Sequence, residues 1–193
     1  KTFSSADIAA IQNSALPGLT TQALAALTTG QIAALTTGQI TALKPAQVAA
    51  LDVEQVEALT PAQVKAMTAA QLAVLSADAF ATFSTADIAA LTAKAVPGLA
   101  SAVITGLSDE QIGALGATAL GGFTTTQIRA LSAHQVEALS PAQLASLNAA
   151  QIAAMNSEAL AQLSPAHMAA INSRAITGLP TSAIAAFSPE QIA

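Results

Sequence analysis

The sequence predicts an all-α solenoid, or superhelix, in which every eight-residue unit forms one short, capped helical turn. Three observations predict this fold: two positions of each octad are always apolar, a helix-capping residue follows the first of them, and nothing interrupts the register. The first apolar series runs from Phe3 to Phe187 and the second from Ile8 to Ile192, with Leu, Ile, Val, Met or Phe at all 24 positions of each. We therefore expect a single continuous array over residues 1–193.

The start of each predicted helix carries four signals that agree on one phase. Ser, Thr, Asp or Asn follows the first apolar residue in 19 of the 24 octads, as an N-cap residue should. Proline comes next in five octads, at the first helical position, where the missing amide hydrogen does no harm; these residues are Pro45, Pro61, Pro141, Pro165 and Pro189. Gln often stands at the third helical position (N3) and completes a capping box, while the two apolar residues flank it as a hydrophobic staple; examples are Gln31, Gln63, Gln111 and Gln151.

Two other architectures fit the pattern less well. In one continuous helix, each octad would leave the apolar stripe about 80° out of phase, and the internal prolines would break the helix. A β-solenoid would also suit an even period, but Ala, Gln and Met are poor strand formers and proline is disfavoured inside a sheet. Short helices held by packing on their neighbours are the better prediction. The small residue before the first apolar position of the octad, such as Ala34, Ala58, Gly106 or Gly122, is expected to let successive turns approach closely.

A longer period is superimposed on the octads. Residues 3–10 return almost unchanged at 83–90, and 55–59 return at 135–139. Leu16-Pro17-Gly18-Leu19 returns ten octads later as Val96-Pro97-Gly98-Leu99. Ten octads therefore form a super-repeat, or block, for which duplication and geometry are both possible causes.

Composition excludes several classes of function. The net charge is −5 with only six Lys and Arg, so there is no basic stripe for nucleic acid and no polybasic membrane anchor. The uncharged stretch 8–43 has polar residues in every octad, so no membrane insertion is expected. The absence of cysteine excludes disulfides and thiolate metal sites.

No residue pattern predicts catalysis, a metal site or a bound cofactor. Asp7 and Asp87 occupy N3 of capping boxes, where a carboxylate is explained by helix capping. His134 stands at the second helical position (N2), as a solvated residue, and His167 stands at N3, in place of the capping Gln. We therefore expect the chain not to be an enzyme.

Two surface patterns leave other interpretations open. The N2 position is variable and often charged, which fits a solvent-facing position or a ligand-facing stripe; its notable residues are Glu54, Asp78, Lys94, Glu110, His134, Glu158, Arg174 and Glu190. Threonine pairs such as Thr28-Thr29 and Thr36-Thr37, and Thr124–Thr126, could form an ice-binding array, although capping already explains the first Thr of each.

The consecutive octads LTTGQIAA (27–34) and LTTGQITA (35–42) resemble tracts in very large repetitive secreted or surface proteins of proteobacteria, of the adhesin or haemagglutinin type. This resemblance extends over essentially the whole chain and implies an extracellular or cell-surface, structural setting. It implies no haem ligands, because His134 and His167 match no haem-binding motif.

The sequence therefore predicts a structural repeat protein, a segment of an extracellular stalk, filament or surface-layer assembly. Both ends fall within the octad pattern and lack a polar capping unit, so we expect self-association, end to end or side by side. The alternative is a solenoid module that binds a protein or glycan through the N2 stripe. A clustered, concave arrangement of the N2 side chains would favour that module, and a scattered, outward arrangement would favour a scaffold.

Overall fold

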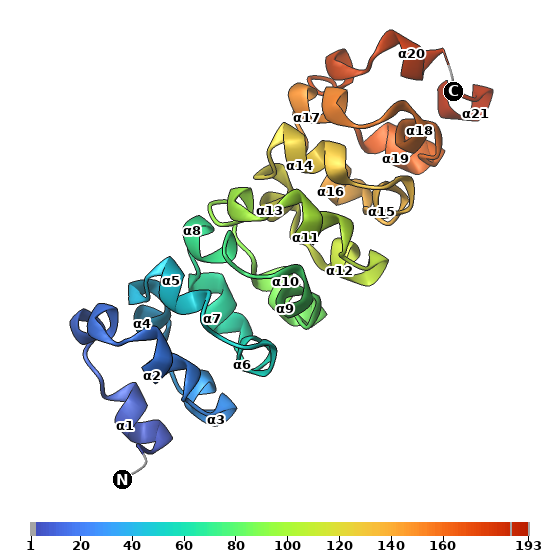
Figure 1. The fold of residues 1–193 in the computed structure, drawn as a ribbon. Coiled ribbons are helices and arrows are strands. Elements are labelled where there is room, and N and C mark those ends of the chain that lie inside the picture. Colours follow the sequence, from blue (N-terminus) through green and yellow to red (C-terminus); the bar gives the residue numbers. More distant parts are fainter. Residues whose placement is uncertain (1–2, 186, 193) are drawn as a thin grey trace.

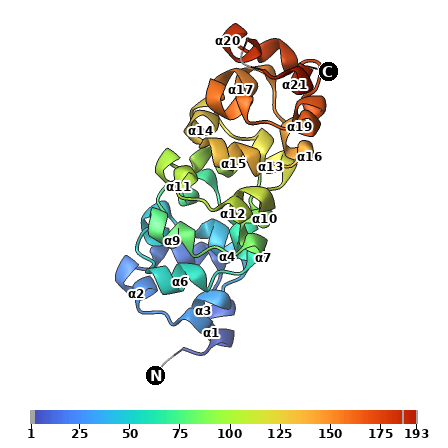
Figure 2. The same ribbon diagram turned by 90° about the vertical axis from the view of Figure 1, so that its right-hand side faces the viewer.

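The computed structural model describes residues 3–185 and 187–192, and it shows a superhelical rod built only of short helices and their connections (Figures 1 and 2). The α-helices are four to six residues long. This confirms the predicted fold class.

The helices follow one another at octad spacing. The first block holds α1 (Ser5–Ala9), η1 (Asn13–Gly18), α2 (Thr21–Ala25), α3 (Thr29–Ala33), α4 (Thr37–Ala42), α5 (Pro45–Val48), α6 (Val53–Glu57), α7 (Pro61–Ala66), α8 (Ala69–Leu72) and α9 (Ala77–Ala81). The second holds α10 (Thr85–Ala90), η2 (Val96–Gly98), α11 (Ser101–Thr105), α12 (Asp109–Ala114), α13 (Ala117–Gly121), α14 (Thr125–Ala130), α15 (Ala133–Glu137), α16 (Pro141–Ala145), α17 (Ala149–Ala154) and α18 (Ser157–Ala161). The third holds α19 (Pro165–Ala170), η3 (Ile176–Gly178), α20 (Thr181–Ile184) and α21 (Pro189–Ile192).

The predicted helix starts are confirmed. The hydroxyl of Thr60 accepts from the backbone N–H of Gln63, and the side chain of Gln63 accepts from the backbone N–H of Thr60. The same capping box forms at the N-termini of α3, α12 and α17. The five prolines named above are the first residues of α5, α7, α16, α19 and α21. Capping therefore sets where most of the helices begin, although α11, α13 and α20 start without a side-chain cap.

Both apolar series form one continuous core along the rod. Phe80, Ile88, Ile104 and Leu120 are among its fully buried side chains. Most octads contribute two buried residues, so the core continues along the array and belongs to no single part of the chain, although Phe3, Ile176 and Ile184 in the first and last turns are exposed. A helix this short is not stable alone, and packing on the neighbouring turns supplies the missing stabilisation.

Successive turns stack at a spacing of about three octads. Helix α7 packs on α4 and on α10, and α14 packs on α11 and on α17. In Figure 1, α3, α6, α9, α12, α15 and α18 follow one long edge of the rod, and α5, α8, α14 and α17 follow the other. Since three helices of the first edge fall in each block, ten octads make three turns of about 27 residues each.

The second octad of each block departs from the prediction of one capped α-helix per octad. Residues 11–18, 91–98 and 171–178 contain the 3-10 turns η1, η2 and η3, which therefore recur once per block. A Cβ atom added to Gly98 would overlap the backbone carbonyl of Ala69, and one added to Gly178 would overlap that of Ala149. No described glycine has a positive φ, so these positions need glycine for space and not for backbone conformation.

The expectation about small residues is confirmed at one glycine and wrong at another. A Cβ atom on Gly122 would meet the backbone of Ala93 in the preceding turn. Around Gly106, the nearest atoms belong to residues 102 and 103 of its own helix, so no neighbouring turn restricts this position.

Candidate functional site

The side chains that join one turn to the next are the N3 glutamines. The amide nitrogen of Gln63 donates to the carbonyl oxygen of Ile32 at 2.8 Å and to that of Leu35 at 2.7 Å. These acceptors lie 31 and 28 residues earlier, so they belong to the preceding turn. The other side-chain atom, Oε1, completes the capping box by accepting from the backbone N–H of Thr60. Each such glutamine therefore holds its own helix start and the turn below it.

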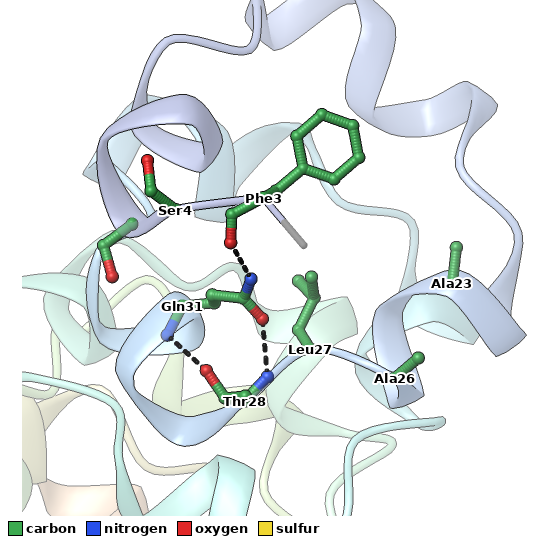
Figure 3. A pocket seen from close by; sticks show the side chains of 8 residues that line it. Phe3, Ser4, Ala23, Ala26, Leu27, Thr28 and Gln31 are labelled. Atoms are coloured by element: carbon green, nitrogen blue, oxygen red, sulfur yellow. Dashed lines mark hydrogen bonds between the residues drawn. The ribbon is translucent and has the colours of Figure 1, made fainter. Parts of the chain in front are cut away.

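We call this set the glutamine ladder. Figure 3 shows its first member, where Gln31 joins Thr28 of its own octad to the carbonyl oxygen of Phe3. Its members all donate to carbonyl groups 28 to 31 residues earlier; they are Gln31, Gln39, Gln47, Gln55, Gln63, Gln71, Gln111, Gln127, Gln135, Gln143, Gln151 and Gln191. The capping-box pattern predicted the contact within the octad but not the contact between turns.

Asp87 interrupts this ladder. It lies at N3, and its Oδ2 accepts from the backbone N–H of Ser84 at 2.9 Å and from the Ser84 hydroxyl at 2.6 Å. Its Oδ1 is buried without a hydrogen-bond partner, and the residue is only 6% exposed. The predicted capping role of Asp87 is confirmed, but a carboxylate has no hydrogen to donate to the turn below.

The other candidate residues for acid–base or metal chemistry also act as caps or lie on the surface. Asp7 is exposed, and hydrogen bonds from the backbone N–H and hydroxyl of Ser4 lower its pKa. Nδ1 of His167 accepts from the backbone N–H of Ser164 at 3.3 Å, so His167 replaces the capping glutamine as predicted. His134 is exposed on α15. Within the described part of the chain, no three His, Asp or Glu residues gather into a group that could hold a metal ion.

Asn172 links two turns without any signal in the octad pattern. Its amide nitrogen donates to the carbonyl oxygens of Ala145 and Leu147, both at 3.1 Å, and its Oδ1 accepts from the backbone N–H of Ala175. Asn172 is an N-cap residue by sequence, and only the 25- and 27-residue separation of its acceptors reveals the second role.

The eight notable N2 residues all face outward and lie in two groups. Glu54, Asp78, Glu110, His134, Glu158 and Glu190 are exposed on α6, α9, α12, α15, α18 and α21. Lys94 and Arg174 are exposed just before η2 and η3, which pack on α8 and α17 at the other edge of the rod. The side chains face outward, as expected for a scaffold, but they lie in groups and are not scattered.

The threonine groups do not form one flat surface. Thr28, Thr36 and Thr124 use their hydroxyls as N-caps of α3, α4 and α14. Helices α3 and α14 lie on opposite edges of the rod (Figure 1). The geometry therefore gives no support to an ice-binding array.

Shallow depressions occur on the sides and ends of the rod. Lys65 and Lys94 line one of about 560 Å³, together with the first residues of α8. Phe3, Ser4 and Gln31 line another of about 610 Å³ near the N-terminal end, shown in Figure 3. Neither contains a carboxylate, and the second contains no charged group at all. These depressions offer no acid–base pair for catalysis.

The first and last turns expose side chains that are buried elsewhere in the array. Phe3 is 66% exposed, whereas Phe83 at the same place in the next block is 3% exposed. Ile176 is 48% exposed, whereas Val96 in the equivalent position is fully buried. In the middle of the rod, a neighbouring turn covers these positions.

Comparison with known families matches the octads themselves. A family model described as the ALTTAQ repeat matches residues 2–37, 35–69, 118–148 and 135–165, which together make up more than half of the 193 residues. No curated protein matches the chain. None of the helices within the described residues is long and apolar enough to cross a membrane.

Proposed function

Because the chain belongs to the ALTTAQ repeat family, whose units fill most of its length, we propose that it is a non-catalytic structural spacer. It would form a stiff segment of a stalk, filament or surface-layer assembly outside the cell. The observation that carries this proposal is the glutamine ladder, whose members make the same contacts between successive turns in two stretches, from Gln31 to Gln71 and from Gln111 to Gln151, and again at Gln191.

Stiffness follows from how the turns are joined. A flexible linker has no contacts between distant residues, whereas here each turn shares the core with the next, and ladder glutamines such as Gln63 tie many of the turns together. Bending the rod would open the core on one side and stretch hydrogen bonds that are buried from water. Added blocks should therefore add length without adding flexibility.

End-to-end stacking is part of this proposal. The exposed Phe3, Ile176 and Ile184 occupy positions that a further turn of the same repeat covers in the middle of the rod. A shallow apolar hollow of about 160 Å³ beside Phe3, lined by Ile11, Leu19 and Leu27, would be filled in the same way. The turn that covers them could come from the same polypeptide or from a second copy.

The test is to measure shape as the array is lengthened. We would insert one additional copy of residues 83–162 after residue 162, which preserves the octad register and the three-turn block. Small-angle X-ray scattering should then show a longer rod of unchanged cross-section, with length increasing by the same amount for each added block. A radius of gyration that grows as in a flexible chain would refute the spacer role. Protease treatment of intact cells would test the proposed location, because only an exposed protein is cleaved.

The alternative is a binding module for a protein or glycan, and one observation favours it. Six of the eight notable N2 residues gather on one edge of the rod, although they line no groove. Binding of glycans or heterologous proteins that is lost when Glu110 and Glu158 are replaced by Gln would support this module over a simple spacer.

A further inference from the structure

The carboxylates of this chain are concentrated on one edge of the rod. Nine of the eleven Asp and Glu residues lie on, or cap, six helices that carry no Lys or Arg. We call this set the acidic column; its exposed residues are Asp52, Glu54, Glu57, Asp78, Asp109, Glu110, Glu137, Glu158 and Glu190. In Figure 1, α6, α9, α12, α15 and α18 follow one edge, and in Figure 2 α6, α9, α12 and α15 face the viewer.

The acidic column is periodic along the rod. Glu57 and Glu137, Asp78 and Glu158, and Glu110 and Glu190 form pairs that are one block apart in the sequence. Because one block makes three full turns, the members of each pair lie at the same side of the rod and are separated by one block length. Hydrogen bonds from its own amide and from the Ser108 hydroxyl lower the pKa of Glu110, which favours its charged form.

A basic set lies on the other side of the rod. Lys44 precedes α5, Lys65 lies in the last turn of α7, and Lys94 and Arg174 precede η2 and η3. We call these four exposed residues the basic side. The elements η2 and η3 pack on α8 and α17, which follow the edge opposite the acidic column (Figure 1).

The basic side matches the acidic column in spacing and shape. Lys94 and Arg174 are also one block apart, so this basic pair has the same period as the acidic pairs, whereas Lys44 and Lys65 have no basic counterpart one block later. Lys65 and Lys94 line one shared depression of about 560 Å³, a concave surface able to receive protruding carboxylates. A row of carboxylates alone would fit any cation, but the matched period points to a second copy of this chain.

We propose that rods associate side by side, with the acidic column of one copy against the basic side of a second, parallel copy. Single exposed ion pairs contribute little, so several pairs in register must act together for such an interface to hold. Each rod presents both surfaces, on opposite sides, and the contact is therefore heterologous and can continue into an open lateral array. This proposal rests on the structural role proposed above, because it describes how such spacers would assemble with one another.

The test is sedimentation velocity of the full chain at rising concentration and two ionic strengths. At about 10 mM salt the Debye length is about 30 Å, and at about 1 M it is about 3 Å, so an electrostatic interface should form in the first and dissociate in the second. Replacing Glu110 and Glu190 by Lys, or Lys94 and Arg174 by Glu, should each weaken association at least tenfold. The matched control exchanges the two basic residues, Lys94→Arg with Arg174→Lys, which keeps both charges and should leave association nearly unchanged.

Mixing the two charge-reversed variants separates a specific interface from a general charge effect. The reversed acidic column of one variant then faces the reversed basic side of the other, and association should return. A chain that stays monomeric at low salt, association that high salt does not weaken, or failure of the mixed pair to associate would overturn the proposal. Binding of oligolysine without self-association would also overturn it, in favour of a different cationic partner. The shape measurement described above is made on single rods, so the spacer role can stand if lateral association fails.

Discussion

Replacing Gln63 by Glu changes a hydrogen-bond donor to an acceptor at the centre of the glutamine ladder and leaves the side-chain shape almost the same. Gln63 is buried, and its amide nitrogen donates to Ile32 and Leu35 of the preceding turn. The glutamate would still accept from the backbone N–H of Thr60, but its second oxygen would face two carbonyl oxygens. Ile32 would keep the hydrogen bond from the backbone N–H of Leu35, whereas the Leu35 carbonyl would lose the donor it has.

The free energy of unfolding should fall by about 3 to 5 kcal/mol, because the change combines an unpaired buried carbonyl with an uncompensated buried charge. Gln63→Met separates the two effects. It leaves the Thr60 N–H and the Leu35 carbonyl unpaired without adding charge, and each unpaired group costs about 1 to 3 kcal/mol. Two such groups together cost about 2 to 6 kcal/mol, so Gln63→Met should destabilise the fold to a similar degree, and any additional loss in Gln63→Glu measures the buried charge.

Urea denaturation followed by circular dichroism measures both variants. The control is Gln22→Glu, because Gln22 is exposed on α2 and a carboxylate near a helix N-terminus is tolerated or slightly stabilising. Hydrogen exchange at α3 and α7 would show whether the loss is local to the two turns that Gln63 joins. An unfolding free energy for Gln63→Glu within about 0.5 kcal/mol of the parent would refute the ladder as a source of stability.

Three further substitutions test the same account of the fold by denaturation. Asp87→Gln should raise the free energy of unfolding by about 1 kcal/mol, because it supplies the missing donor where Oδ1 is now unpaired; no gain would show that the ladder is not needed at this turn. Gly98→Ala should lower it by about 1 to 3 kcal/mol through overlap with the turn below. Gly18→Ala, at the same place in the first block and free of neighbours within 4 Å, should have little effect, and equal losses at both would contradict the steric explanation. Ala100→Ser should add about 1 kcal/mol by supplying an N-cap hydroxyl to α11, which has none; an unchanged midpoint would mean that this cap is already satisfied.

Local structure could be predicted from the sequence because its causes lie within one octad. Thr60, Pro61 and Gln63 specify a helix start through contacts three residues apart or fewer, and the structure has that start where expected. The apolar series could likewise be identified as core, because Phe83 and Ile88 recur at the two positions that face inward.

Contacts between turns could not be predicted, because they depend on how many octads complete a turn. The capping box explained Gln63 fully at the level of the octad, and nothing in that pattern indicated that its amide nitrogen reaches 28 to 31 residues back. Because the number of octads per turn cannot be read from the sequence, the steric need for glycine at position 98 and the contact of Asn172 with the preceding turn could not be predicted either. It also hid the grouping of N2 charges, although pairs such as Glu110 and Glu190 were visible at the ten-octad period.

Asp87 indicates why the repeat uses glutamine at N3. An N3 side chain that links two turns must accept one hydrogen bond from its own N-cap and donate to the turn below, and a carboxylate can only accept. Asp87 accepts the hydrogen bond from its N-cap, Ser84, but it donates none to the turn below, and its Oδ1 is buried without a partner. Glutamine is neutral and carries both an acceptor and two donor hydrogens, so it meets both requirements without burying charge.

The neutrality of the ladder has a consequence for the surface. Within residues 3–185 and 187–192, core and ladder hold the turns together without ion pairs, so the fold there does not require the charges of the acidic column to be on one edge. Exposed carboxylates could be distributed over all helices with less mutual repulsion, as like charges usually are when only solubility matters. Their concentration on helices such as α6, α12 and α15, opposite basic residues with the same ten-octad period, is therefore better explained by contact with a partner than by folding.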